Sequence, residues 1–183
     1  MSVLNYKDDN HNLQIKKTMN NKNDNIIILD NEDRIAMRSR MYKLGNYIYE
    51  NFKDLINYKN LNHSQNEINR LLMSQNVILF LYLVDNKIEG YLVCETTGCN
   101  VLFINYIYVV NKYRGHKIGS QLMSSAMEYA KKINIRNIDL ISEIDSVAYN
   151  WYKSLGFMKN NDVNVGDKKH LMLSLNLNNR RYK

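Results

Sequence analysis

The sequence predicts an α+β fold built on a mixed, mostly antiparallel sheet, with a central β-α-β crossover and helices on both faces. Two observations predict this fold. Short apolar runs separated by turn residues occupy positions 77–110, which is typical of an antiparallel meander. An apolar stripe at helical spacing follows directly, and another apolar run comes after it, which is the pattern of a crossover connection.

The length of 183 residues is that of one domain with a substantial core. Residues 1–24 are polar and without a steady period, so we expect a flexible N-terminal arm. The folded domain is expected at residues 25–176. Residues 177–183 form a basic C-terminal tail.

The first elements are predicted from capping residues and periodicity. A short strand is expected at Asn25–Leu29, and the acidic residues at 30–33 suit the start of a helix. The apolar stripe of this helix is Ile35, Met41, Leu44, Ile48 and Phe52, with a break expected near Gly45. Residues 59–63 are predicted to be a loop. Ser64–Glu67 is a capping box, which starts a short helix that buries Ile68, Leu71 and Leu72.

Three strands are predicted next. Val77–Val84 is a continuous apolar run, and the Asp85-Asn86 pair is a candidate two-residue hairpin turn. The return strand runs from Lys87 to about Glu95. After a turn at residues 97–100, Val101–Val110 is dense in Val, Ile, Phe and Tyr, so we expect a central strand that is buried on both faces.

The crossover and the end of the domain follow. A helix from Ile118 to about Lys132 has the apolar stripe Ile118, Leu122, Ala126, Ala130 and Ile133. A strand at Asn137–Ser142 and a helix at about Ser146–Leu155 come next, and Gly156 ends that helix. Two more strand candidates close the domain, Phe157–Asn160 and Lys168–Leu175.

The turn between the central strand and the crossover helix has the features of an anion site. It contains Gly115 and Gly119, and Arg114, His116 and Lys117 surround it. Backbone N–H groups at a helix N-terminus are unpaired, and the helix dipole adds partial positive charge there. The neighbouring cations favour a phosphate-bearing ligand over a carboxylate. The turn matches neither the dinucleotide fingerprint nor the P-loop.

The order Arg-Gly-His-Lys-Ile-Gly at residues 114–119 resembles the Arg/Gln-x-x-Gly-x-Gly/Ala loop of the GNAT family of N-acetyltransferases. In that family the amides of this loop hold the pyrophosphate of acetyl-CoA. Lys117 departs from the pattern, because the family usually has Gly there. The segment from Ala148 to Phe157 resembles a second family signature, Ala-x-x-Leu/Phe-Tyr-x-x-x-Gly-Phe. The resemblance covers roughly residues 25–176.

The resemblance implies the GNAT-type acyl-CoA N-acyltransferase fold, in which two middle strands splay apart around the cofactor. It implies acetyl-CoA as the acetyl donor and direct attack by a primary amine, without an acyl-enzyme. Pantetheine is rich in amides, so an exposed strand edge can hold it. The expected cofactor-binding residues are Tyr108, Val109, Val110, Arg114, Gly115, His116, Lys117, Ile118, Gly119 and Ser120.

The resemblance implies that Tyr152 is the catalytic acid that protonates the departing thiolate. The alternative is that Tyr152 packs, or donates a hydrogen bond to the sulfur without transferring its proton. Asp145 occupies a position at which the family often has an Asn that bonds the cofactor. A carboxylate there repels phosphate.

The expected catalytic base is Glu143, just after the strand that follows the crossover helix, because the acceptor amine must lose a proton before it attacks. Glu95, or water relayed by Asn105 or Tyr106, is the alternative. His170 is expected at the surface, as are His11 and His63.

The acceptor cannot be read from the sequence. The expected acceptor wall carries Tyr42, Tyr47, Tyr49 and Tyr58 with few carboxylates. A polyamine or aminoglycoside site would be expected to gather acidic groups. A peptide N-terminus, a lysine side chain or a small-molecule amine is therefore favoured.

Two other functions stay open. One is a module that binds acetyl-CoA or CoA without catalysis, motivated by Lys117 and Asp145. The other is a basic nucleic-acid-binding protein, motivated by the formal net charge of +7. The absence of an aromatic-basic motif or a reading helix argues against nucleic acid.

Compositional features bound the remaining possibilities. The cysteines, Cys94 and Cys99, fit neither a redox pair nor a zinc site, so no metal is predicted. No signal peptide or membrane-length apolar run is recognised, so the expected location is the cytoplasm, without a membrane partner. Dimers are common in the family, which leaves a homodimer open.

Overall fold

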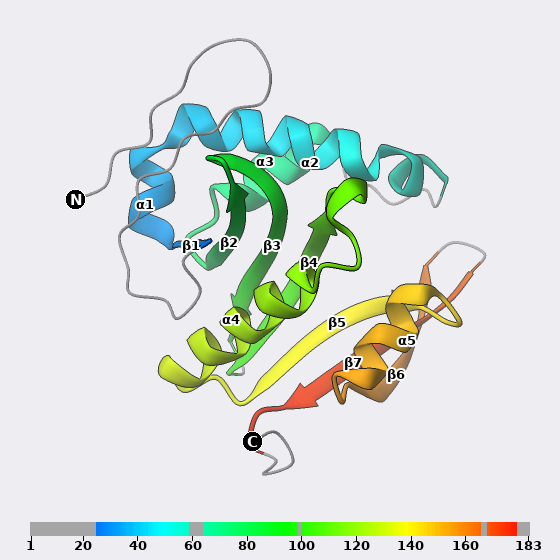
Figure 1. Ribbon diagram of the computed structural model, residues 1–183. Coiled ribbons are helices and arrows are strands. Elements are labelled where there is room, and N and C mark those ends of the chain that lie inside the picture. The colour runs from blue at the N-terminus through cyan, green and yellow to red at the C-terminus, as the bar shows by residue number, and fades with distance from the viewer. Residues whose placement is uncertain (1–24, 59–63, 99, 166–167, 179–183) are drawn as a thin grey trace.

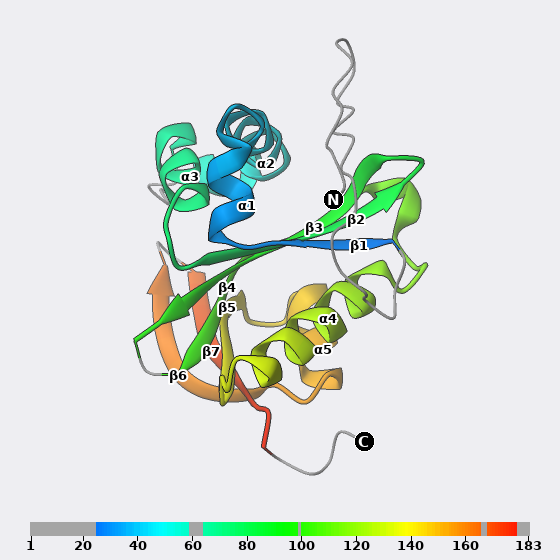
Figure 2. The same cartoon turned by 90° about the vertical axis from the view of Figure 1, so that its left-hand side faces the viewer.

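The computed structural model describes residues 25–58, 64–98, 100–165 and 168–178. A seven-stranded sheet with the strand order β1-β2-β3-β4-β5-β7-β6 runs through the molecule (Figure 1). Helices α1, α2 and α3 lie on one side of this sheet, and α4 and α5 lie on the other (Figure 2). The predicted α+β fold is confirmed. The predicted arm at 1–24, the loop at 59–63 and most of the C-terminal tail lie outside the described residues.

The elements of the first half follow the predicted order, except that two helices stand in place of the predicted first helix. Strand β1 is followed by three helices and then by the antiparallel strands β2, β3 and β4. Their bounds are β1 Ile26–Leu29, α1 Asn31–Ala36, α2 Arg38–Tyr58, α3 Gln65–Leu72, β2 Val77–Val84, β3 Lys87–Thr97 and β4 Val101–Val109.

The elements of the second half contain the crossover. Helix α4 connects β4 to β5, and these two strands are parallel. The bounds are a 3-10 turn at Asn111–Tyr113, α4 Ile118–Lys132, β5 Asn137–Glu143, α5 Val147–Ser154, β6 Met158–Val165 and β7 Lys168–Asn176.

The hairpin between β2 and β3 has the predicted two-residue turn. Asp85 and Asn86 have φ of 49° and 63°. Positive φ at both central residues is the signature of the type I′ turn, whose twist matches that of the strands it joins.

Two apolar cores lie on the two faces of the sheet. The core on the α4 and α5 side includes Phe80, Leu92, Leu102, Leu122 and Leu140. The core on the α1–α3 side includes Met41, Ile48, Leu72, Leu79 and Tyr91. The sheet therefore presents two differently lined faces, and the site uses both.

The predicted first helix is two helices, and its break is not at Gly45. Helix α1 ends before Met37, and α2 continues unbroken through Gly45. A Cβ at Gly45 would lie 1.9 Å from Asn69 Oδ1, so this glycine lets α3 approach α2 closely. The bend at Met37 also explains why Ile35, predicted to be buried, is 56% exposed.

Arg34 takes the buried position that the apolar stripe assigned to Ile35. Its side chain is fully buried. One guanidinium nitrogen, Nη1, donates to the carbonyl of Leu72, and Nη2 donates to the carbonyls of Ser74 and Val77 at 2.8 and 2.7 Å. The Leu72 carbonyl is at the C-terminal end of α3, where a helix leaves acceptors without partners, whereas Ser74 lies in the connection and Val77 begins β2. Arg34 thus joins α1 to the α3–β2 connection.

Three further expectations need correction. Strand β4 alternates buried and half-buried residues instead of being buried on both faces. Strand β6 runs to Val165, well past the predicted Asn160, because it pairs with β7 through its backbone while its polar side chains give no apolar signal. His170, expected at the surface, is only 5% exposed.

Candidate active site

The site begins where β4 and β5 part. Their parallel pairing runs from Val101 and Asn137 to Ile104 and Leu140 and ends there. A β-bulge lies at the same level, because β3 pairs Cys94 with Ile104 but Val93 with Tyr106. Asn105 is therefore the extra residue, and a bulge bends its strand and increases its twist. Among the described residues, no strand pairs with the β5-side edge of β4 beyond this point.

Alternate residues of β4 turn their backbone groups toward this opening. The Val110 N–H donates to the Glu89 carbonyl of β3 at 3.0 Å. Because backbone groups alternate in direction along a strand in an antiparallel pair, those of Tyr108 also face β3. The N–H and C=O of Ile107 and Val109 point the other way. Val109 was predicted to bind the cofactor, whereas Ile107 was not, because the sequence does not show which edge an amide faces.

The predicted phosphate loop forms a tight turn that leads into α4. Gly115 has φ of 82° and Lys117 has φ of 62°, both in the left-handed region. Lys117 is the N-cap of α4, and no side chain caps that end. The N–H groups of Ile118, Gly119 and Ser120 therefore lack a side-chain partner at the positive end of a 15-residue helix.

The cations of the loop are exposed and arranged around the same end of α4. Arg114 Nε donates to the Val109 carbonyl at 3.1 Å, and its guanidinium carbon lies 5.7 Å from the centre of the Tyr108 ring. His116 Nδ1 lies 3.1 Å from the Arg114 carbonyl. Arg114 therefore occupies the mouth of the opening.

Gly119 is where three elements meet. A Cβ placed there would lie 3.5 Å from the Trp151 ring of α5 and 3.9 Å from Val109 Cγ2 of β4. These are ordinary contacts, so the first turn of α4 adjoins both the β4 edge and α5. Unpaired amides, neighbouring cations and the free β4 edge fit a ligand with a phosphate end and an amide-rich arm.

Tyr152 lies on the α4 and α5 side of the opening. It is 6% exposed, and its ring packs near those of Trp151 and Phe157, with centroid distances of 5.0 and 5.6 Å. Burial raises the pKa of Tyr152 above the usual 10.0, and the nearby Cys94 adds to this. Cys94 pairs with Ile104, the last β4 residue bonded to β5. The phenol is therefore neutral and lies close to where the opening begins.

Glu143 lies on the other face. Ile138 and Leu140 of β5 belong to the core against α4 and α5. Because side chains alternate along a strand, Asp139 and Glu143 face the α1–α3 side. Glu143 is half-buried and comes after the last residue of β5 that pairs with β4.

The alternative bases lie in less suitable positions than Glu143 for taking a proton at the opening. Glu95 pairs with Phe103, on the closed side of the point where the strands part. Burial raises the pKa of the Tyr106 phenol, and the Glu67 carboxylate adds to that rise, so the phenol stays protonated. Asn105 Nδ2 is buried without a hydrogen-bond partner among the described residues, so it is available to a bound group.

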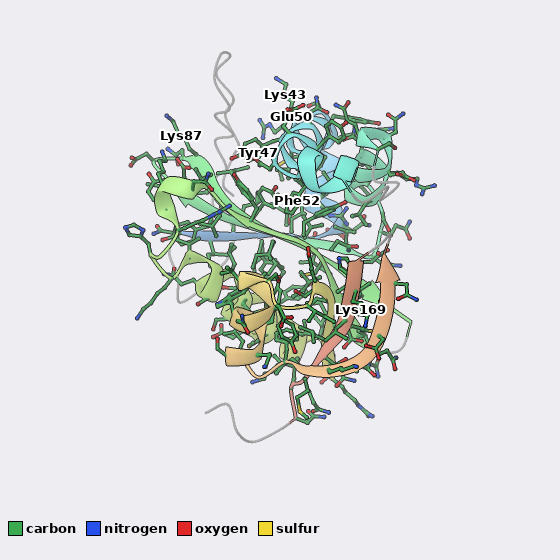
Figure 3. The ribbon with its side chains drawn as sticks, turned by 90° about the vertical axis from the view of Figure 1, so that its right-hand side faces the viewer. Lys43, Tyr47, Glu50, Phe52, Lys87 and Lys169 are labelled. Atoms are coloured by element: carbon green, nitrogen blue, oxygen red, sulfur yellow. The ribbon has the colours of Figure 1, made fainter. Side chains whose placement is uncertain are left out.

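An aromatic wall covers the α1–α3 side of the opening. Phe52 of α2 lies 5.1 Å from Tyr106 and 6.0 Å from Tyr108, between ring centroids. Tyr108 stacks on Tyr91 at 5.5 Å, and Tyr47 meets Tyr91 edge-on at 6.0 Å. Figure 3 shows Tyr47 and Phe52 between α2 and the sheet. Of the predicted wall residues, Tyr47 belongs to this group, while Phe52 and Tyr91 were missed.

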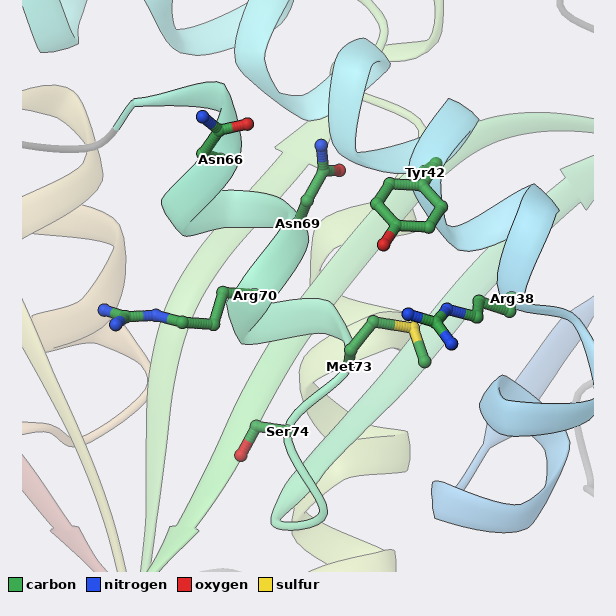
Figure 4. A pocket seen from close by; sticks show the side chains of 7 residues that line it. All are labelled: Arg38, Tyr42, Asn66, Asn69, Arg70, Met73 and Ser74. Carbon is green, nitrogen blue, oxygen red and sulfur yellow. The ribbon is translucent and has the colours of Figure 1, made fainter.

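A second hollow lies between α2 and α3 (Figure 4). Its volume is about 500 Å³, and it is lined by Arg38, Tyr42, Asn66, Asn69, Arg70, Met73 and Ser74. Tyr42, expected on the acceptor wall, lines this hollow instead and is 43% exposed. None of the residues described at the opening lines it, so this hollow is separate from the opening.

Metal and membrane features can be stated for the described part of the chain. It contains no group of three or more His, Cys, Asp or Glu side chains placed to hold a metal ion. None of its helices has the length and apolar character needed to span a membrane.

Residues 46–157 match the model of the Acetyltransferase (GNAT) family. This match includes the opening, the phosphate loop and α5. An uncharacterized N-acetyltransferase of Methanocaldococcus jannaschii is 33% identical over 97 residues, which cover 43% of this chain and 43% of that protein. The chain thus matches less than half the length of this relative.

Solved structures share the fold. A putative streptothricin acetyltransferase of Bacillus anthracis, in complex with acetyl coenzyme A, is 26% identical with a TM-score of 0.52, covering 56% of this chain and 64% of that one. The PaiA N-acetyltransferase of Thermoplasma acidophilum, in complex with coenzyme A, is 18% identical with a TM-score of 0.58, covering 82% and 98%. The second likeness concerns the fold alone.

Proposed function

This chain belongs to the GNAT acetyltransferase family, and on that premise we propose that it transfers the acetyl group of acetyl-CoA to a primary amine by direct attack. The observation that carries the proposal is the convergence at Gly119. There the uncapped N-terminus of α4 meets the free β4 edge and α5. A phosphate site next to an open strand edge is what an extended acyl-CoA requires.

The chain's own groups divide the task of binding. The amides of Ile118, Gly119 and Ser120 take the pyrophosphate, and Arg114, His116 and Lys117 supply positive charge beside it. The backbone groups of Ile107 and the carbonyl of Val109 bond the amides of the pantetheine arm. Arg114 leaves the Val109 carbonyl when this arm enters, because both need the same acceptor.

Bound acetyl-CoA supplies a thioester. The Val109 N–H faces the opening and donates to the carbonyl oxygen on which negative charge develops. Glu143 takes the proton of the incoming ammonium from the α1–α3 side. Tyr152 faces the thiolate from the α4 and α5 side and supplies its proton. A primary amine reaches Glu143 past the aromatic wall, as a peptide N-terminus, a lysine side chain or a small-molecule amine.

A module that binds acetyl-CoA without turnover is the second candidate. Lys117 holds φ of 62° at a position where the family usually has Gly, which costs roughly 1 kcal/mol. Asp145 adds an exposed carboxylate after β5. This candidate would be excluded if the wild type acetylated an amine and Tyr152→Phe abolished that activity.

The experiment is thermal unfolding with and without acetyl-CoA. Binding to the folded state alone stabilises it by about 2.7 kcal/mol at a hundredfold excess over Kd, so the wild-type midpoint should rise. Gly119→Glu should lose this rise, because its carboxylate lies among the pyrophosphate amides. The site has room for a Cβ, since the nearest atom is 3.5 Å away, so the variant should fold.

The matched control is Gly98→Glu. Gly98 is exposed, and a Cβ there would meet no atom within 4 Å. It lies in the β3–β4 turn, away from the opening, so this variant should keep the wild-type rise. An unchanged midpoint in the wild type would contradict the proposal. A screen of amine acceptors follows if the midpoint rises.

A further inference from the structure

His170 is a buried histidine that the binding and transfer steps above do not use. It lies near the start of β7 and is only 5% exposed. In the antiparallel pairing of β5 with β7, the residue directly opposite His170 is Glu143. Directly opposed side chains on one face have Cβ atoms about 4.5–5.5 Å apart, so an imidazole and a carboxylate can reach each other there.

The register fixes the face on which this pair lies. Leu171 and Leu173 of β7 belong to the core against α4 and α5, as does Leu140 of β5. His170 and Glu143 alternate with these residues, so both side chains face the α1–α3 side. That is also the side of the aromatic wall, which includes Phe52 and Tyr106.

The position of Glu143 and His170 along their strands places the pair at the opening. Pairing of β5 with β4 ends at Leu140, whereas pairing of β5 with β7 continues to Glu143 and His170. The pair therefore lies on the part of β5 from which β4 has separated. Tyr152 lies on the opposite face, in the core against α4 and α5.

We propose that His170 positions Glu143 and that the two form the proton-accepting pair for the amine. This inference rests on the proposed function. His170 donates an imidazole N–H to one carboxylate oxygen, and this holds the other toward the opening. Glu143 takes one proton from the ammonium, and the neutral amine attacks the thioester carbonyl; the C–N bond forms, the C–S bond breaks, and Tyr152 protonates the thiolate. The second proton lost by the acetylated nitrogen restores the Tyr152 phenol, and the proton on Glu143 leaves to solvent.

Other titratable groups on this face bear on the pH dependence of the pair. Asp139 lies on β5, Tyr106 and Tyr108 on β4, and Glu67 on α3. Strand β6 places the non-titrating Val163 opposite His170. His170 is the histidine directly opposite Glu143.

The test is the pH profile of kcat/KM for wild type, His170→Gln and His170→Phe. Loss of the pair should lower kcat/KM about 10-fold and shift the acidic limb of the pH profile. His170→Gln should stay closer to the wild type, because it keeps a hydrogen-bond donor. KM for acetyl-CoA should not change. Ser174→Ala, on the same face of β7 but opposite Asp139, is the control and should match the wild type.

A second measurement leaves His170 intact. In wild type, an imidazole N–H bonded to Glu143 should give a downfield proton resonance that Glu143→Gln shifts. The pair would be overturned if both His170 variants turned over substrate with the wild-type pH profile. It would also be overturned if Glu143→Gln left the resonance unchanged. Either result would leave the proposed function intact. A wild type that neither binds acetyl-CoA nor acetylates any amine would overturn both.

Discussion

At the scale of single residues, the proposed acid and base approach the opening from opposite faces of one sheet. Tyr152 is buried against Trp151 and Phe157, and burial raises the pKa of its phenol, which therefore stays protonated in the working range. A neutral phenol can donate to a departing sulfur throughout that range. Glu143 is half-buried on the other face, where an amine can arrive without crossing the donor.

We therefore expect Tyr152→Phe to lower kcat about 100-fold, because it removes the proton donor. The ring and its packing are kept, so the unfolding midpoint and KM for acetyl-CoA should stay close to wild type. Steady-state kinetics measures both constants. Tyr149→Phe, on the same helix, is the matched control. An unchanged kcat in Tyr152→Phe would show that the hydroxyl only packs.

At the scale of elements, α2 and α3 form the layer that carries part of the aromatic wall. Gly45 lies in the middle of α2 and has Asn69 of α3 directly against it. Glycine inside a helix costs about 0.5–1 kcal/mol relative to alanine. The close approach of the two helices gives a physical reason for this residue.

We expect Gly45→Ala to lower the free energy of unfolding by about 1 kcal/mol, because its Cβ would displace the Asn69 side chain. In an Asn69→Ala background the same change should instead stabilise by about 0.5–1 kcal/mol, the ordinary gain in helix propensity. Urea unfolding of the four proteins measures the coupling. Additive effects would show that the contact does not restrain α2.

At the scale of the whole molecule, buried tyrosines lie in the cores on both faces of the sheet, close to the opening. Burial raises the pKa of Tyr91 and Tyr106 on one face and of Tyr152 on the other above the usual 10.0. Because the folded-state pKa values lie above the unfolded ones, their contribution to stability is fully present below about pH 10 and falls as the pH rises further.

We therefore expect the free energy of unfolding to fall steeply above about pH 10, as unfolded tyrosines ionise while the buried ones stay neutral. Urea unfolding at a series of alkaline pH values measures this slope. Tyr91→Phe should make the slope shallower, whereas the change of the exposed Tyr42 to Phe should not. Equal slopes in all three proteins would contradict the assignment to buried tyrosines.

The sequence alone determined the order of elements and the two segments that define the family. The turn from Arg114 to Gly119 and the segment from Ala148 to Gly156 depend on glycine chemistry and local periodicity, which short stretches carry by themselves. The hairpin at Asp85 and the capping box at Ser64 were predicted for the same reason. The proposed roles of Tyr152 and Glu143 stay predictions, as do the domain limits and the homodimer.

Only the tertiary structure decided how distant residues meet. Strand register decides where the pairing of β4 with β5 ends and which β4 amides, those of Ile107 and Val109, face the opening. It also decides that His170 lies opposite Glu143. The burial of Arg34 depends on acceptors more than thirty residues away. A sequence gives the alternation of a strand but not its partner. Pairing and register are set by burial over the whole sheet, which no local pattern contains.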